Sequence, residues 1–265
     1  MSTHVIHDTT VLTKRSLRHI LRSPDTILTT AVTPIAMLLL FVYVFGGAIV
    51  SGGTIPGTSG DRGNLAAYVD YLLPGILLVT VASGIAYTAF RLFTDVSSGI
   101  FERFQSMPIA RSAVLWGHIL TSIVANLISL VLVGGVALLI GFRSSAGILN
   151  WFAIAGLLIL FTLALAWLAV IPGLMATSVD GVSGFSYPLI FLPFISSAFV
   201  PTVGMPRPLA WFADHQPVTP IVNALRHLMA DQPVGTEGWT ALAWCAGLLV
   251  VAYALAMATF HRKLS

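Results

Sequence analysis

The sequence predicts an all-α, polytopic membrane protein with six transmembrane helices. Hydrophobic residues make up 57% of the chain and charged residues only 9%, whereas a soluble domain usually carries about 25% charged residues. Uncharged stretches of the length that crosses a bilayer, about 20 residues, recur along the whole sequence. The basic residues gather at the ends of these stretches, which is where membrane topology places them.

The apolar stretches divide a single transmembrane domain, residues 1–265, into six predicted spans. A Gly/Ser/Thr-rich connector at 51–64 separates the first two, and Pro172-Gly173 is expected to kink or end the fourth near the inner face. No charged residue occurs between Arg143 and Asp180. The predicted transmembrane helices are 27–49, 68–90, 113–141, 148–177, 182–200 and 239–260.

The distribution of basic residues predicts that both termini are cytoplasmic. With that topology, nine of the 13 Lys and Arg residues lie on the inner side and four on the outer side, as the positive-inside rule requires. The net charge of +3 is therefore accounted for by topology, and it gives no reason to expect a nucleic-acid partner.

The N-terminal segment 9–22 is predicted to form an amphipathic helix on the inner membrane surface. Lys14, Arg18 and Arg22 are spaced i, i+4, i+8 and share one face, with Arg15 beside them. A cationic face of this kind suits lipid phosphates. The alternative is a positive flank of the first span with no role of its own.

The inner loop between spans 2 and 3 contains a second short predicted helix, 97–106. Ser97-Ser98 could cap its start and Met107-Pro108 would end it. Phe101 and Phe104 are three residues apart and share a face. Such a helix could dock a soluble partner, although an ordinary amphipathic loop buried among headgroups fits the pattern equally well.

The outer segment 197–228 is too polar to span a bilayer and too apolar for a simple loop, and a hairpin is predicted over 205–229. Met205-Pro206 and Pro208 could start one short helix over 209–213, and Pro220 a second over 221–229. Two short helices joined by a Pro-containing turn predict a re-entrant hairpin between spans 5 and 6, which must pack on protein at membrane depth. The alternative is a cap that lies on the membrane surface.

Several chemical functions are disfavoured by what the sequence lacks. Cys245 is the only cysteine, so no intrachain disulfide forms, and the His residues and carboxylates do not cluster as in an enzyme or a metal site. No GxxxxGK[ST] phosphate loop is present, so a separate chain must supply any ATPase activity. The spans also carry no charged residue near their centres, which disfavours a proton- or sodium-coupled carrier.

Two blocks of sequence resemble the membrane subunit of type-2 ABC exporters, and the daunorubicin-resistance permease group in particular. The inner-loop block, 95–115, has the family pattern D…G…ER…P in Asp95, Gly99, Glu102-Arg103 and Pro108. The outer block consists of Ser197-Ala198-Phe199-Val200-Pro201, Met205-Pro206, Pro217-Val218-Thr219 and Ala224-Leu225-Arg226. Gln216 departs from the family, which often has Asn at this position.

The resemblance implies a bacterial inner-membrane exporter subunit that pairs with a second permease, as a homodimer or heterodimer, and with ABC ATPase subunits. ATP and magnesium would be bound by the ATPase, and this chain would carry no cofactor. The implied ATPase-coupling residues are Asp95, Gly99, Phe101, Glu102, Arg103, Phe104 and Pro108, and the implied interfacial residues are Lys14, Arg15, Arg18 and Arg22. The implied outer-gate hairpin residues are Phe199, Pro201, Pro206, Pro217, Thr219 and Arg226.

The function expected from the resemblance is export of hydrophobic or amphipathic drugs or lipids from the cytoplasm or inner leaflet. An apolar path suits such a substrate, because the desolvation of a charged one would be costly. Export of a lipid-linked glycan is the alternative within the family. An ATP-independent channel or secondary carrier for small hydrophobic solutes is the alternative outside it.

Overall fold

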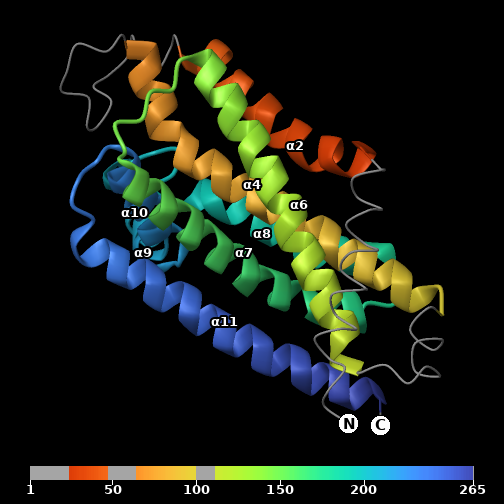
Figure 1. The fold of residues 1–265 in the computed structure, drawn as a ribbon. Helices are drawn as coiled ribbons and strands as arrows, with labels where there is room; N and C mark the ends of the chain where they lie inside the picture. The colour runs from red at the N-terminus through yellow and green to blue at the C-terminus, as the bar shows by residue number, and fades with distance from the viewer. Residues whose placement is uncertain (1–23, 47–63, 100–110, 265) are drawn as a thin grey trace.

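The computed structural model describes residues 24–46, 64–99 and 111–264, and these ranges are helical with no strand (Figure 1). Four of their helices are long and apolar enough to cross a membrane. These are α4 (Asn64–Ser97), α6 (Arg111–Ile140), α7 (Ile148–Met175) and α11 (Gly235–Leu264). The chain is therefore a multi-pass membrane protein.

Two shorter apolar helices continue into helical turns of a different pitch. The helix α2 (Pro24–Leu39) leads into a π-helix, η1 (Leu40–Phe45), and α8 (Val179–Phe191) leads into a 3₁₀ turn, η2 (Leu192–Ile195). With these turns included, both segments are still shorter than the four long helices.

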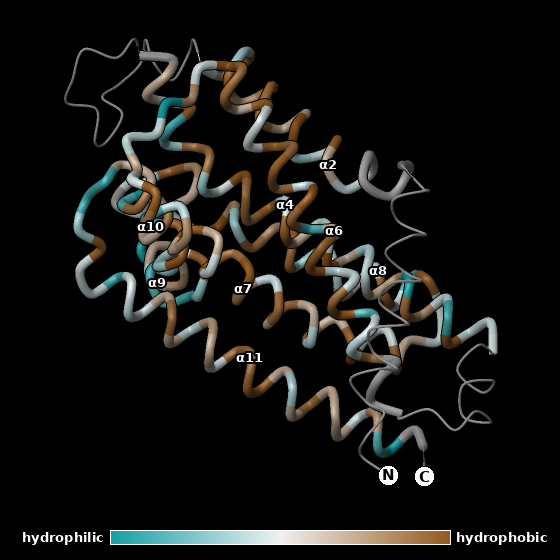
Figure 2. Tube along the Cα trace, in the orientation of Figure 1, coloured by the Kyte–Doolittle hydropathy of each residue, from teal (hydrophilic) through white to brown (hydrophobic). Residues whose placement is uncertain are grey.

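The helix α4 lies at the centre of the bundle and packs against α2, α6, α7 and α8 (Figure 1). In its apolar stretch 83% of the residues are buried, against 28% in α6 and 22% in α11. Figure 2 shows that the outer helices are also hydrophobic along most of their length. Such exposed apolar faces are expected to contact lipid or another subunit, because lipid tails are as apolar as the side chains themselves.

The helices alternate in direction, so the bundle has two distinct ends. One end holds the last residues of α4, α7 and α11, and the opposite end holds two short helices, α9 (Arg207–His215) and α10 (Val218–Met229). The amphipathic helix α10 buries its apolar face against α4, α7 and α11. Two short helices joined at Gln216-Pro217 are thus present between α8 and α11.

The helix predicted over 182–200 is shorter in the structure and begins earlier. Ser178 caps its start by accepting a hydrogen bond at Oγ from the Gly181 amide (3.2 Å), and the α-helix ends at Phe191. Pro193 has no amide hydrogen to continue the ladder, and Ser196 is extended, with φ −131° and ψ −178°. The backbone over 196–200 is therefore not helical.

The helix α4 extends to Ser97, seven residues beyond the predicted end of the second span. Ser97 and Ser98 were expected to cap a new helix, but their hydroxyls donate to the carbonyls of Thr94 and Asp95 in the last turn of α4. Gly99 then adopts a left-handed conformation with φ 70°, which glycine tolerates without a steric penalty. A helix starting at residue 97 is therefore excluded, and residues 100–110 lie outside the described ranges.

Candidate functional site

The non-helical segment after η2 is held in place by side chains of the two short helices. Thr219 Oγ1 accepts a hydrogen bond from the Ser197 amide (3.4 Å) and donates to the Ala213 carbonyl (2.5 Å). Gln216 donates from Nε2 to the Ile195 carbonyl. These bonds tie α9 and α10 to the end of η2, so the predicted hairpin residue Thr219 joins all three elements.

Arg226 extends from α10 into the junction between α4 and this segment. Its guanidinium stacks 4.1 Å from the centre of the Tyr71 ring, and it donates to the carbonyls of Tyr71 and Ser197 (both 3.2 Å). It also donates to Asn223 Oδ1 at 3.2 Å.

Ser197, the first residue of the outer block identified in the sequence, is the centre of these contacts. Its carbonyl also accepts from the Tyr71 hydroxyl (3.1 Å), and its own hydroxyl donates to Asn223 Oδ1 (3.0 Å). Asn223 in turn donates to Glu237 Oε1 at 3.3 Å, which links α10 to α11. We call these five residues, Tyr71, Ser197, Asn223, Arg226 and Glu237, the outer polar cluster.

A row of phenylalanine rings lies beside the outer polar cluster. Phe199 stacks on Phe194 and Phe41 with centroid distances of 4.7 and 5.1 Å, and Phe45 and Phe191 extend the row at either end. The row therefore connects η1 to the end of α8, η2 and the segment that follows. Gly75 allows the segment that carries Ala198 and Phe199 to lie close to α4, because a Cβ on Gly75 would lie 2.7 Å from Ala198 Cβ.

The predicted hairpin prolines lie at the starts of helical segments rather than in the polar contacts. Pro201 precedes the short 3₁₀ turn η3 (Thr202–Gly204), Pro206 precedes α9 and Pro217 precedes α10. Their fixed φ suits a helix start, where no amide hydrogen is needed. Of the predicted hairpin residues, Phe199, Thr219 and Arg226 come together around Ser197, and the prolines set the local backbone.

At the opposite end of the bundle, Asp95 joins α4 to α6. Its Oδ2 lies 3.2 Å from His118 Nε2. Gly99, the other predicted coupling residue in the described ranges, ends the turn that follows α4. The remaining predicted coupling and interfacial residues lie outside the described ranges: Phe101, Glu102, Arg103, Phe104, Pro108, Lys14, Arg15, Arg18 and Arg22.

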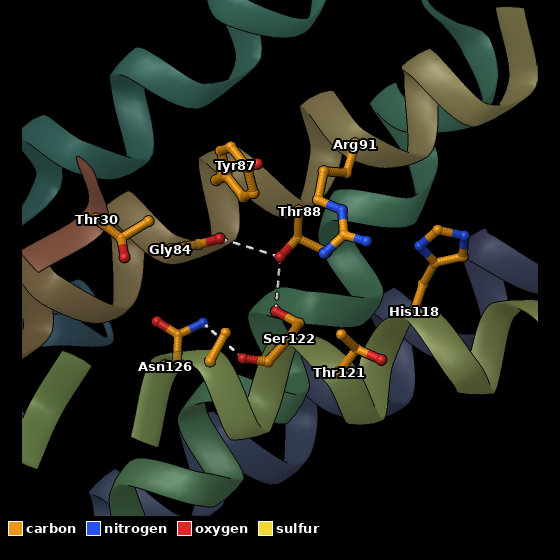
Figure 3. A pocket seen from close by; sticks show the side chains of 10 residues that line it. Thr30, Gly84, Tyr87, Thr88, Arg91, His118, Thr121, Ser122 and Asn126 are labelled. Carbon is orange, nitrogen blue, oxygen red and sulfur yellow. Dashed lines mark hydrogen bonds between the residues drawn. The ribbon is translucent and has the colours of Figure 1, made fainter. Parts of the chain in front are cut away.

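A polar pocket lies between α2, α4 and α6, in the half of the bundle that contains Asp95 (Figure 3). The space between its lining residues is about 390 Å³ when the open solvent at its mouth is included, and its inner part has room for only about one or two water molecules. Its lining residues are Thr30, Gly84, Tyr87, Thr88, Arg91, His118, Thr121, Ser122, Ala125 and Asn126. Arg91 and His118 are its basic residues, and hydroxyl and carboxamide groups add uncharged polar atoms to a lining that is otherwise apolar.

Hydrogen bonds link the helices around this pocket. Thr88 Oγ1 and Ser122 Oγ are 2.7 Å apart across the contact between α4 and α6, and Thr30 Oγ1 lies 3.0 Å from Ser129 Oγ. Polar side chains of this kind hold membrane helices together. This pocket was not predicted from the sequence, because most of its lining residues carry no charge. The pairs Gly84/Thr88 and Ser122/Asn126 are each spaced i, i+4 in an uncharged stretch of helix. This spacing places small or polar residues on one face of α4 and of α6, and it is the feature of the sequence that indicates the pocket.

Gly84 and Asn126 fit closely against each other at the deep end of the pocket. A Cβ on Gly84 would lie 2.2 Å from Asn126 Oδ1 and 2.7 Å from its Cγ. Asn126 is only 2% exposed, and its Nδ2 donates to the Ser122 carbonyl at 3.1 Å. The absence of a side chain at Gly84 therefore provides the space for the Asn126 carboxamide.

The described residues contain no group of three or more His, Cys, Asp or Glu side chains that could hold a metal ion. At one end of the bundle Asp95 contacts His118, and at the other end Arg226 donates to two backbone carbonyls.

Comparison with known proteins identifies the relatives of the chain. The model of a family described as ABC-2 type transporter matches residues 7–230, which include the pocket and the hairpin. The daunorubicin resistance ABC transporter permease protein DrrB1 of Streptomyces coeruleorubidus is 30% identical over 248 residues, covering 91% of this chain and 81% of that protein. The probable doxorubicin resistance ABC transporter permease protein DrrC of Mycobacterium tuberculosis is 26% identical over 239 residues, covering 89% and 83%.

The fit between Gly84 and Asn126 predicts that Gly84→Ala destabilises the protein. The added methyl group would collide with a buried carboxamide, and overpacking of this kind costs about 2 kcal/mol. Gly156→Ala in α7 is the matched control, because a Cβ there meets nothing within 4 Å. Thermal unfolding of the purified full chain in detergent measures the difference, and equal melting temperatures for the two variants would contradict the packing.

The contacts of Arg226 predict that Arg226→Met destabilises the outer end of the bundle by about 2 kcal/mol. The substitution leaves buried carbonyls without their donor. Arg226→Lys should recover only part of the loss, because an ammonium cannot reproduce the planar stack and the spread of donors. Arg207→Met, an exposed arginine of the same hairpin, is the control in the unfolding assay. A loss no larger than that of the control would show that the outer polar cluster does not stabilise the fold.

Proposed function

Because the chain belongs to the ABC-2 type transporter family, we propose that it is the permease subunit of an ATP-driven exporter. Its substrates would be hydrophobic or amphipathic drugs or lipids, moved out of the cytoplasm or the inner leaflet. The observation that carries this proposal is the similarity to two drug-resistance permeases over about nine-tenths of the chain.

The proposed topology has six spans with both termini in the cytoplasm of a bacterial cell. The four long helices supply four of the spans, and α2 with η1 and α8 with η2 supply the other two. The short α8 segment is completed by the hairpin, which re-enters the membrane and packs on α4, α7 and α11. Such a broken helix is tolerated at membrane depth when its backbone groups are bonded within the protein.

The proposed partners are a second permease subunit and two ABC ATPase subunits. The ATPase would bind ATP and magnesium and would dock at the end of the bundle that holds Asp95, through the loop 100–110 and the N-terminal segment. ATP binding would favour one of two permease conformations, because a ligand shifts an equilibrium toward the state that it binds better.

The outer end of the bundle would form the gate on the substrate path. The ring contacts of Phe199 with Phe41 and Phe194 join η1, η2 and the segment after η2, so they would have to separate when the path opens outward. Arg226 and Thr219 hold the backbone that carries Phe199, and the polar bonds would keep this segment ordered while the rings move.

Transport into inside-out membrane vesicles tests the proposal, with daunorubicin as the probe because a relative is named for resistance to it. The chain is expressed with the ATPase that co-purifies with it. We expect ATP-dependent accumulation of the drug that is lost when the phosphate-loop lysine of that ATPase is replaced. Accumulation that survives without ATP and collapses with the proton gradient would instead support an ATP-independent carrier.

The gate proposal predicts that Phe199→Ala lowers net ATP-dependent accumulation about fivefold while ATP hydrolysis continues. The loss of two stacked contacts destabilises the closed state by about 1 kcal/mol. A free-energy change of this size changes the ratio of closed to open states by about fivefold. Phe152→Ala is the control, since Phe152 is 71% exposed on α7, away from the row of rings. Equal accumulation in the two variants would argue against a gate at Phe199.

A further inference from the structure

The two short helices of the hairpin differ in what they bury. The helix α10 buries seven of its 12 residues, whereas α9 buries only Ala213. The large apolar side chains of α9 lie on its outside: Trp211 is 65% exposed, Phe212 43% and Leu209 41%. We call these three residues the apolar edge of α9. Within the described part of the chain, α9 packs mainly on α10, η2 and η3, so its apolar edge lacks a cover.

The other residues of α9 separate into a protein-facing side and a polar side. Ala213 is buried, and its carbonyl accepts the hydrogen bond from Thr219 of α10. Arg207 and Asp214 are both exposed and are seven residues apart, which places them on the same side of the helix. The helix α9 therefore presents its apolar edge and a charged side to two different surroundings outside the protein.

The tryptophan of the apolar edge is held in place by its own helix. The His215 ring stacks on the Trp211 ring, with 4.7 Å between the centroids and 23° between the planes. His215 Nδ1 donates to the Trp211 carbonyl at 2.7 Å, because a carbonyl oxygen can only accept. The indole is thus ordered by α9 although most of its surface is exposed.

Two further exposed tryptophans lie at the same end of the bundle as α9. Trp239 is near the start of α11 and 75% exposed, and Trp151 is near the start of α7 and also exposed. Both helices are long and apolar enough to cross a membrane, and both begin at the end that holds α9 and α10 (Figure 1). Tryptophan is enriched where such helices meet the lipid head groups, so Trp211 adds to an aromatic level that α7 and α11 already mark.

The length and composition of α9 fit the surface of a bilayer better than its interior or bulk water. Nine residues of α-helix extend only about 14 Å, whereas the hydrocarbon core is about 30 Å thick. In bulk water the apolar edge would be left without burial. A helix in the interface buries an apolar face at the boundary of the acyl chains and keeps its charged side among the head groups. The Arg207 guanidinium suits a lipid phosphate there.

We propose that α9 lies in the lipid interface at this end of the bundle, with its apolar edge directed into the acyl-chain boundary and with Arg207 and Asp214 among the head groups. The hairpin then has two arms: α10 is embedded against α4, α7 and α11, and α9 is the interfacial arm. This leaflet is the outer one in the proposed topology, whereas the lipid contact itself does not depend on the export function.

Spin labels on α9 test its surroundings. Cys245 is the only cysteine, so a Cys245→Ala chain takes a single label at Leu209→Cys or at Phe212→Cys. The full chain is reconstituted in vesicles of phosphatidylcholine and phosphatidylglycerol. Relaxation of each label is measured with oxygen, which partitions into lipid, and with a nickel chelate, which stays in water. We expect both labels to lie about 5–10 Å below the lipid phosphates.

Matched positions calibrate the measurement. A label at Val250→Cys, on the exposed face of α11, is the lipid reference, and a label at Asp214→Cys reports the charged side of α9. We expect nickel to relax the Asp214→Cys label about fivefold more than the Phe212→Cys label. Labels on both sides of α9 that respond equally to nickel would show that α9 faces water. Shielding of Leu209→Cys and Phe212→Cys from both reagents would show a protein cover, such as a second copy of the chain. Either result overturns the proposal, whether or not the chain exports daunorubicin.

A tryptophan substitution tests the anchor within this edge. Trp211→Gln should raise the accessibility of the Phe212→Cys label to nickel about twofold, because an indole favours the interface and a carboxamide does not. Trp151→Gln is the control, since it removes an exposed indole at the same end of the bundle but on α7. An equal response of the label to the two substitutions would overturn the assignment of Trp211 as the anchor.

Discussion

The end of the bundle that holds α9 and α10 depends on one constraint. Where a helix is broken within a membrane protein, the protein itself must provide hydrogen-bond partners for the backbone groups that the break exposes. The break after η2 frees the polar groups of residues 195–198. Gln216 donates to the Ile195 carbonyl, Thr219 accepts from the Ser197 amide, and Arg226 donates to the Ser197 carbonyl. The hairpin therefore supplies the hydrogen bonds that the interrupted helix lacks.

This constraint explains why a charged residue is retained at Arg226. A partly buried guanidinium is costly unless its donors are used, and here the two terminal nitrogens bond to two carbonyls and one carboxamide oxygen while the face of the group covers the Tyr71 ring. Its fixed, planar arrangement of donors allows one side chain to join α4, α10 and the segment at Ser197. A shorter or non-planar side chain could not satisfy the three partners together.

Much of the helical architecture could be predicted from the sequence, because hydropathy reports directly which segments are long and apolar. The prediction was wrong where local chemistry outweighs hydropathy: the helix over 182–200 ends early at Phe191, and Ser97 belongs to α4 rather than to a new helix. Arg226 stood out as an unusual charge. Its partners Tyr71 and Ser197 did not, since they lie 155 and 29 residues away in the chain.

The polar pocket was missed for a different physical reason. Apart from Arg91 and His118 at one end, its residues are uncharged and fall within apolar helices, so the mean hydropathy of α4 and α6 stays high. The packing of the two helices brings the polar residues together, because Gly84 on α4 leaves space for the Asn126 side chain on α6.

The central helix α4 carries residues of the outer polar cluster, of the pocket and of the contact between Asp95 and His118. Tyr71 belongs to the outer polar cluster, Gly84 and Thr88 line the pocket, and Asp95 contacts His118 at the opposite end. A tilt or rotation of α4 would therefore alter the outer segment, the pocket and the end proposed to meet the ATPase at the same time. A rigid helix with specific contacts at three levels is a physical connection through which these sites can influence one another.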